Sequence, residues 1–175
     1  MTKIKTREPE IDRIGRETFI NLFLAAGRLT DEVETVCKAQ DLTMAHYTVL
    51  WIVCLSDGDH QNGVPMGAIA DGLFTRASDV TRLVDRLTKA GHLERFPSET
   101  DRRVVLVKAT PSGRDLFLRL TADIKSLHRE QWSALSQSEV RQLLGLLSKV
   151  YWREKAPSSK HPLESMPPIL AASND

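Results

Sequence analysis

The residues best suited to bind another molecule lie between positions 76 and 103, where arginine and hydroxyl side chains alternate with apolar ones. Val80, Leu83, Val84 and Leu87 are spaced three and four apart, which predicts an amphipathic helix. The other face of this helix is basic and carries hydroxyl groups, and a short basic hairpin is expected to follow it. Arginine binds phosphates and guanine edges, and hydroxyl groups bind phosphates or bases. The pattern therefore predicts a helix that lies in a DNA groove.

Nine residues are candidates for this contact. They are Arg76, Ser78, Asp79, Thr81, Arg82 and Arg86 on the helical segment and Asp101, Arg102 and Arg103 at the hairpin tip. Asp79 would repel phosphates, so its expected role is to read a cytosine amino group or to orient Arg82. The alternative is a solvated face on which Arg82 pairs with Asp79 or Asp85. Arg95 and Lys108 flank the hairpin and either touch the DNA backbone or only solubilise the tip.

Composition sets limits on the partners. The chain has 175 residues, 41% of them hydrophobic and 27% charged, and a net charge of +1, so any affinity for nucleic acid must come from a local patch. The length fits one domain. The first ten residues lack the apolar core of a signal peptide, and no apolar run is long enough to cross a membrane. We therefore expect a cytoplasmic protein.

Other chemistries have no motif here. The five histidines are scattered without metal-ligand spacing, and neither a nucleophile elbow nor a phosphate-binding loop occurs. We expect no metal, no cofactor and no enzymatic activity. Cys37 and Cys54 leave open a thiol-based redox switch, although Cys54 on an apolar helix face is better explained as a core residue.

Capping and turn residues delimit the elements. We expect helices over residues 10–40, 44–55 and 66–73, a recognition helix from residue 75 or 77 to Gly91, strands over 93–96 and 104–107, and helices over 111–132 and 137–155. Val64 is expected to join the sheet as a single residue. The expected caps are Thr43, the Thr110-Pro111 pair and the Ser136-x-x-Glu139 capping box.

The order of these elements predicts a mainly α fold with a small β wing. A winged helix-turn-helix over residues 43–110 would be flanked by N- and C-terminal dimerisation helices over 10–40 and 111–156. Together these form one domain over residues 10–156, between a flexible N-terminus over 1–9 and a disordered, proline-rich tail over 157–175. The first and last helices are too apolar to stand alone, so each needs a partner.

Across residues 42–116 the chain resembles the MarR family of winged-helix transcriptional regulators. The matching residues are the run from Ser78 to Leu87, Gly91, the wing run from Asp101 to Val107, and Thr110-Pro111 with Gly113. The resemblance implies a homodimer whose terminal helices interlock and whose two winged lobes read a pseudo-palindromic operator in double-stranded DNA. It also gives Asp101 and Arg103 the role of holding the shape of the wing.

The resemblance further implies a repressor that a small effector, an aromatic acid or a phenol, releases from DNA. The residues expected to face that effector are Arg28, His46, Tyr47, Trp51 and Trp132, with Arg28 as a carboxylate partner. Tyr47 and Trp51 are, however, better explained as core residues than as ligand contacts. A winged-helix adaptor that docks another protein is the alternative function, although the polar face of the predicted recognition helix disfavours it.

Overall fold

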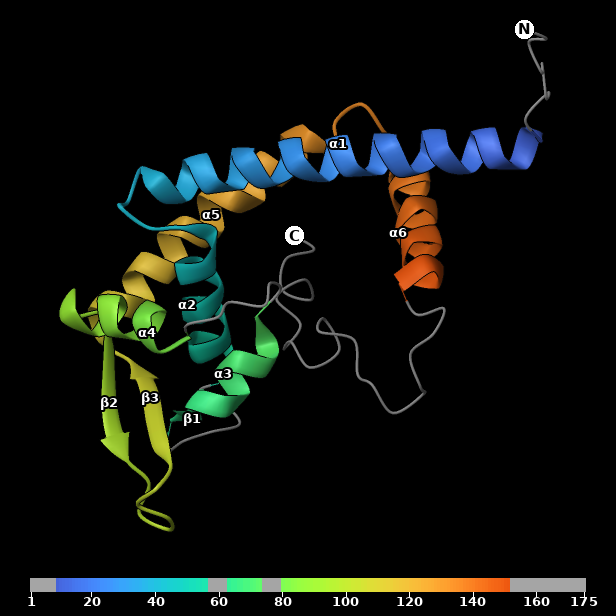
Figure 1. Ribbon diagram of the computed structural model, residues 1–175. Coiled ribbons are helices and arrows are strands. Elements are labelled where there is room, and N and C mark those ends of the chain that lie inside the picture. The colour runs from blue at the N-terminus through green and yellow to red at the C-terminus, as the bar shows by residue number, and fades with distance from the viewer. Residues whose placement is uncertain (1–8, 57–62, 74–79, 152–175) are drawn as a thin grey trace, which may run out of the picture.

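The computed structural model describes residues 9–56, 63–73 and 80–151, which form six helices and a small sheet (Figure 1). The elements in order are α1 (Glu10–Lys38), α2 (Met44–Ser56), β1 (Val64–Pro65), α3 (Met66–Gly72), α4 (Val80–Lys89), β2 (Leu93–Pro97), β3 (Val105–Ala109), α5 (Pro111–Gln131) and α6 (Gln137–Tyr151). The predicted mainly α fold with a β wing is confirmed. No helix within the described residues is both long and apolar enough to cross a membrane.

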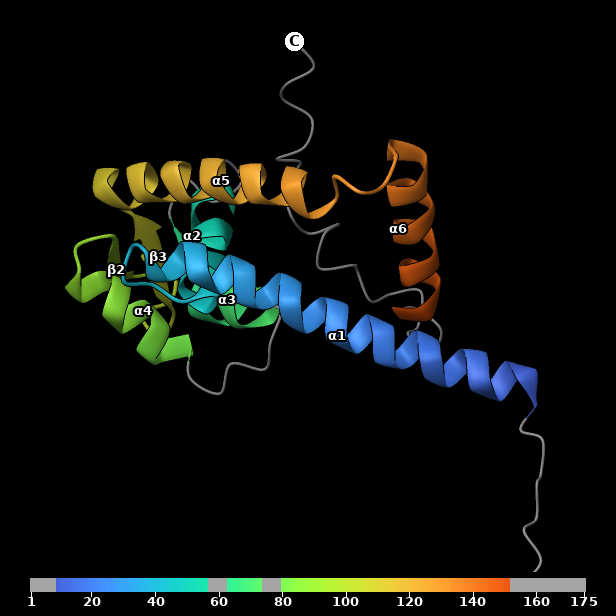
Figure 2. The same cartoon turned by 90° about the horizontal axis from the view of Figure 1, so that it is seen from above.

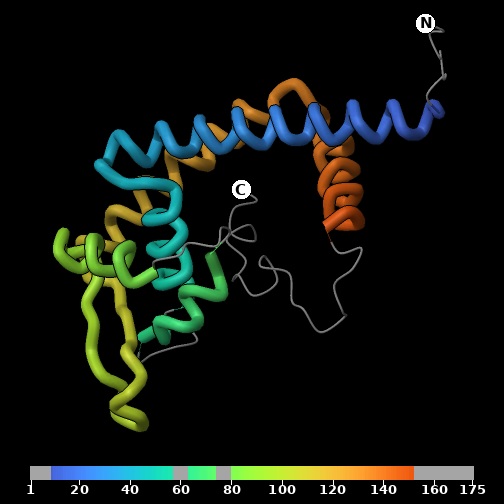
Figure 3. Tube along the Cα trace, viewed as in Figure 1, coloured from blue at the N-terminus to red at the C-terminus, as the bar shows by residue number. Residues whose placement is uncertain are grey.

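The sheet is antiparallel, with β3 between β1 and β2. Val64 pairs with Val107, and Leu93 pairs with Ala109 at the open end of the β2–β3 hairpin, away from its turn. Helices α2, α3 and α4 pack around this sheet to form a lobe, and the hairpin extends from it as the wing (Figure 1). The Cα trace shows α4 on one side of the lower end of α2 and α3 on the other side (Figure 3).

One apolar core holds the lobe to the long helices. Fully buried side chains from α2, α3, α4 and the sheet include Leu50, Ile69, Leu87 and Val107, and Leu120 joins them from α5. The predicted apolar face of α5 is also found, because Leu116 and Ile124 are buried with Leu120. Burying a large aliphatic side chain contributes about 1.5–3 kcal/mol, so this core fixes the orientation of α5 on the lobe.

Most of the predicted caps are present. Thr110 accepts a hydrogen bond from Gly113 N at 3.1 Å, and Ser136 and Glu139 form the reciprocal capping box. Gly91 has a φ of 76° and ends α4, as expected for a residue in the left-handed region. Pro65 precedes α3 as its N-cap.

The start of α2 has a cap that the sequence only half predicts. Thr43 Oγ1 accepts from His46 N at 3.4 Å, and Thr43 N donates back to His46 Nδ1 at 3.2 Å. His46 thus takes the place that Glu holds in an ordinary capping box. Its side chain is buried, and that burial, together with the charge of Arg86, lowers its pKa.

The wing differs slightly from the prediction. The sequence places the second strand over residues 104–107, but β3 spans Val105–Ala109. Val104 N is instead bonded to Asp101 O at 2.9 Å and so belongs to the tip. The strand continues to Ala109 because Leu93 pairs with that residue.

The first and last helices project beyond the lobe (Figure 2). Within α1 only Val33 and Cys37 are buried, and α6 has no buried residue. Large apolar side chains on both helices are exposed: Ile11, Ile14, Phe19, Ile20, Leu22, Phe23 and Leu24 on α1, and Leu144, Leu146, Val150 and Tyr151 on α6. An apolar surface of this extent marks an interaction site rather than a solvated face.

Gly113, in the first turn of α5, gives a test of the fold. A Cβ at this position would collide with the main-chain oxygen of His92, in backbone that cannot yield easily. We expect Gly113→Ala to lower the free energy of unfolding by about 1–3 kcal/mol. Gly67→Ala is the control, because nothing lies near the Cβ there and alanine favours helix. Thermal unfolding at one protein concentration measures both, and equal stability of the two variants would contradict the packing described.

Candidate nucleic-acid interface and ligand pocket

Helix α4 and the wing lie next to each other at the end of the molecule away from α6 (Figure 1). Apolar Val84 and Leu87 turn into the core, while Thr81 and Arg82 are exposed. Three of the predicted DNA contacts, Arg76, Ser78 and Asp79, lie outside the described residues, as does the predicted start of the recognition helix. Of the predicted DNA contacts on the described part of α4, Thr81 and Arg82 are therefore exposed and face away from the core.

Arg95 braces the wing against α4. It lies on β2, where its Nη1 pairs with Asp85 Oδ1 at 2.7 Å and its Nη2 donates to Thr81 O at 3.0 Å. The side chain of Arg95 is largely covered. Two contacts from one planar guanidinium fix both distance and angle. Arg95 therefore holds α4 and the wing together as one unit.

Arg86 takes a role that its position on α4 does not reveal. Its Nη2 donates to the main-chain oxygen of Asp41 at 2.6 Å, across 45 positions of sequence. Asp41, with a φ of 55°, sits in the turn between α1 and α2. The exposed part of the guanidinium still allows the predicted contact with DNA, but this hydrogen bond directs it towards the turn.

The wing tip is shaped by its own side chains. Asp101 Oδ1 accepts from Arg103 N at 3.0 Å, and Ser98 N donates to Val104 O at 2.9 Å. Asp101 therefore orders the main chain of the tip, where Arg102 and Arg103 are both exposed. Two neighbouring cations on an ordered hairpin can follow a phosphate backbone or enter a minor groove.

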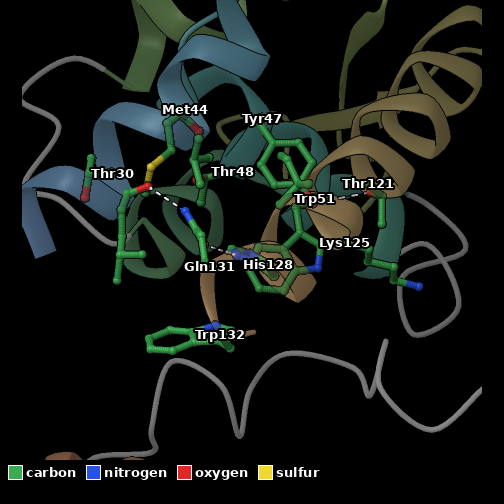
Figure 4. Close-up of a pocket in the computed structure, with 13 residues that line it drawn as sticks. Thr30, Met44, Tyr47, Thr48, Trp51, Thr121, Lys125, His128, Gln131 and Trp132 are labelled. Carbon is green, nitrogen blue, oxygen red and sulfur yellow. Dashed lines mark hydrogen bonds between the residues drawn. The ribbon is translucent and has the colours of Figure 1, made fainter. Parts of the chain in front are cut away.

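A cavity of about 420 Å³ lies between α1, α2 and α5 (Figure 4). This volume is in the range of small-molecule sites. Its walls are mostly apolar, and its lining residues are Leu29, Thr30, Val33, Met44, Tyr47, Thr48, Trp51, Thr121, Ile124, Lys125, His128, Gln131 and Trp132. The cavity suits a flat apolar ligand with a polar edge.

Three of the five residues predicted to face a ligand line this cavity, namely Tyr47, Trp51 and Trp132. The rings of Tyr47 and Trp51 are stacked at 6.4 Å, and both also pack against the core, so the core and ligand interpretations hold together. Tyr47 Oη lies 3.3 Å from Thr121 Oγ1, and burial raises the pKa of this tyrosine.

Arg28 and His46 lie elsewhere. Arg28 borders a second hollow between α1 and the end of α5, and its Nε donates to Glu32 Oε1 at 2.9 Å. His46 serves as the α2 cap described above. The cation in the cavity lining is instead Lys125, and beside it are His128 and Gln131.

Sequence reasoning missed these three residues because it followed the apolar face of α5. Lys125, His128 and Gln131 recur at intervals of three along α5, next to the buried stripe of Leu120 and Ile124. That spacing puts them on one adjoining face. Only the approach of α1 and α2 shows that this face lines a cavity.

Neither Cys37 nor Cys54 forms a disulfide. Cys37 is completely buried, and that burial, reinforced by the charge of Glu34, raises its pKa to about 11. Cys54 packs against the core. A reactive thiol needs a lowered pKa and access to solvent, so Cys37 has neither property of a sensor. Among the described residues no group of three acidic, histidine or cysteine side chains is placed to hold a metal ion.

Comparisons with known proteins agree with this architecture. A family model described as the MarR family matches residues 40–104, which span the lobe from the α1–α2 turn to the wing. The transcriptional repressor IacR of Pseudomonas putida is 27% identical over 147 residues, which cover 82% of this chain and 84% of IacR.

Two solved structures have the same fold. A mutant MarR of E. coli in complex with operator DNA superposes with a TM-score of 0.64 at 27% identity, over 81% of this chain and 95% of that one. CouR of Rhodococcus jostii RHA1, bound to p-coumaroyl-CoA, has a TM-score of 0.64 at 24% identity, over 85% of this chain and 99% of CouR.

The arrangement of α4 and the wing agrees with the family match and with these relatives. All of them indicate a transcription regulator rather than an enzyme. Residues 40–104 of the chain match the MarR family, and the chain as a whole is similar to transcriptional regulators of that family.

Proposed function

We propose that this regulator is a homodimeric repressor that binds a pseudo-palindromic operator and leaves it when an aromatic acid occupies the cavity. The observation that carries the proposal is the rigid unit of α4 and the wing, which presents Arg82 on the helix and Arg102 and Arg103 on the tip. The helix would enter the major groove and the tip would reach the adjacent backbone or minor groove. The DNA-bound MarR relative supports this geometry.

The exposed helices α1 and α6 supply the dimer interface. Phe19 and Phe23 stack at 6.4 Å on the outer half of α1, where both side chains remain exposed. A second copy of the chain can cover this apolar face, because a two-fold interface buries the same patch on both copies. A dimer also places two lobes on one duplex, as pseudo-palindromic recognition requires.

The cavity supplies the effector site. Its apolar walls and stacked rings accommodate an aromatic body, and Lys125 offers a cation for a carboxylate. Two relatives of known structure support an aromatic effector, since one is bound to p-coumaroyl-CoA and another is regulated by 6-hydroxynicotinic acid. The effector would act by binding better to a lobe arrangement that does not fit the operator.

The interface is tested with the double variant Arg82→Ala/Arg103→Ala. Each lost base or phosphate contact costs about 1–3 kcal/mol, so affinity for operator selected from random DNA should fall at least about 100-fold. The log–log salt dependence should also become shallower. Arg119→Ala/Arg129→Ala removes the same charge from two exposed positions on α5 and should leave binding intact. Gel shifts at two salt concentrations measure both, and undiminished affinity of the first variant would refute the interface and favour the adaptor.

Sedimentation tests the dimer. Phe23→Glu places a charge on the exposed apolar face of α1 and should give a monomer that no longer shifts operator DNA. Leu118→Glu is the matched control, because Leu118 on α5 is exposed to a similar degree, 63% against 69% for Phe23. That control should remain a dimer. A dimeric Phe23→Glu variant would place the interface elsewhere.

The thiol-switch alternative predicts a reactive Cys37, and the structure predicts an inert one. With a pKa of about 11, roughly one thiol in a thousand is ionised at pH 8, against about one in ten or more when unfolded. In a Cys54→Ser background, iodoacetamide should label Cys37 at least about 100-fold more slowly in the folded protein than in urea. Mass spectrometry of timed samples gives both rates, and equal rates would revive the redox mechanism.

A further inference from the structure

A chain of hydrogen-bonded side chains runs from α1 to the edge of the cavity, and Figure 4 shows its end at Gln131 and His128. Arg28 Nε donates to one carboxylate oxygen of Glu32 at 2.9 Å, and Gln131 Nε2 donates to the other at 2.9 Å. These donors, Arg28 first, lower the pKa of Glu32 and keep it an acceptor. Gln131 Nε2 also donates to Leu29 O at 3.3 Å. Two acceptors on α1 therefore fix which end of the Gln131 amide carries the nitrogen.

The orientation of Gln131 determines which ring nitrogen of His128 carries the hydrogen. The amide oxygen of Gln131 lies 2.8 Å from His128 Nδ1. Since an amide oxygen can only accept, Nδ1 must carry the hydrogen. In the neutral imidazole the other ring nitrogen, Nε2, then has no hydrogen and can only accept. His128 thus offers a ligand an acceptor of fixed kind.

The other polar groups around the cavity have a different character. Thr30 and Thr48 donate their hydroxyl hydrogens to Ala26 O and Met44 O at 2.7 and 2.9 Å along their own helices. Lys125, one turn before His128 on α5, is a cation that can only donate. The α5 side of the cavity therefore combines a site for an anion with a site for a hydrogen-bond donor.

We propose that His128, held in one tautomer by Gln131, is a specificity-determining residue that selects ligands bearing a hydroxyl group over ligands of the same shape without one. This inference rests on the proposed aromatic-acid pocket and adds the second group that the pocket reads. The carboxylate meets Lys125, and the hydroxyl donates to His128 Nε2. A methyl group is the right comparison, because it is similar in size to a hydroxyl group and cannot donate a hydrogen bond.

The test uses matched pairs of small acids: 2-, 3- and 4-hydroxybenzoate, each with the methylbenzoate of the same substitution. Calorimetric titration of the full-length protein at pH 8, where histidine is ordinarily neutral, gives a dissociation constant for each acid. At one ring position or more, the hydroxy acid should bind about 5- to 10-fold more tightly than its methyl partner, as expected of one neutral hydrogen bond.

Three variants then locate the selectivity. His128→Phe keeps a ring without the acceptor, and Gln131→Met keeps the length without fixing the tautomer, so both should bring the hydroxy-to-methyl ratio close to one. Lys125→Met is the matched control on the same helix. It should weaken both members of a pair by the same factor and leave the ratio unchanged, which a general disturbance of α5 would not do.

The outcomes separate this inference from the proposed function. A wild-type ratio near one with measurable binding would overturn the role of His128 and leave the aromatic-acid pocket standing. A ratio that survives His128→Phe would assign the hydroxyl to another residue and overturn it as well. If none of the six acids binds, the aromatic-acid pocket fails, and this inference fails with it.

Discussion

The hydrogen bond from Arg86 to the main chain of Asp41 joins the two parts of the molecule that a regulator must couple. Asp41 lies between α1 and α2, and both helices line the cavity. The same turn is held by Glu34 Oε2, which accepts from Met44 N at 2.6 Å, and by the reciprocal pair of Thr43 and His46. A ligand that changed the spacing of α1 and α2 would therefore move the anchor of α4. By linkage, if DNA fixed α4 as we propose, it would change ligand affinity in the cavity by the same factor.

Arg95 and Arg86 connect α4 to two different parts of the molecule. Arg95 holds it to the wing through Asp85 and Thr81, and Arg86 holds it to the turn. Packed cores transmit displacement rather than absorb it, so α4, the wing and the turn respond together. A small change in the orientation of this unit therefore moves Arg82 and the wing tip together.

Local patterns were sufficient for most of the fold. The caps at Thr43, Thr110 and Ser136 and the left-handed Gly91 depend on residues a few positions apart, and the structure has them all. The candidate site was harder to predict, because its contacts join distant segments. The position of Arg86 on the polar face of α4 suggested only DNA, and its bond to Asp41 spans 45 residues. In the same way, Gln131 meets Glu32 across 99 residues, and no periodicity on α5 reports that approach.

Helix α6 has no side chain buried by the described part of the chain, although its capping box makes it a well-formed helix. The stability of the lobe therefore places almost no demand on the side chains of α6. Substitutions there would be constrained mainly by the proposed partner of α6, whereas substitutions in α4 are constrained by the core and would also be constrained by the DNA groove that we propose it enters. Choice of partner and choice of DNA sequence can consequently change independently, and duplicated copies of such a gene could diverge in one without losing the other.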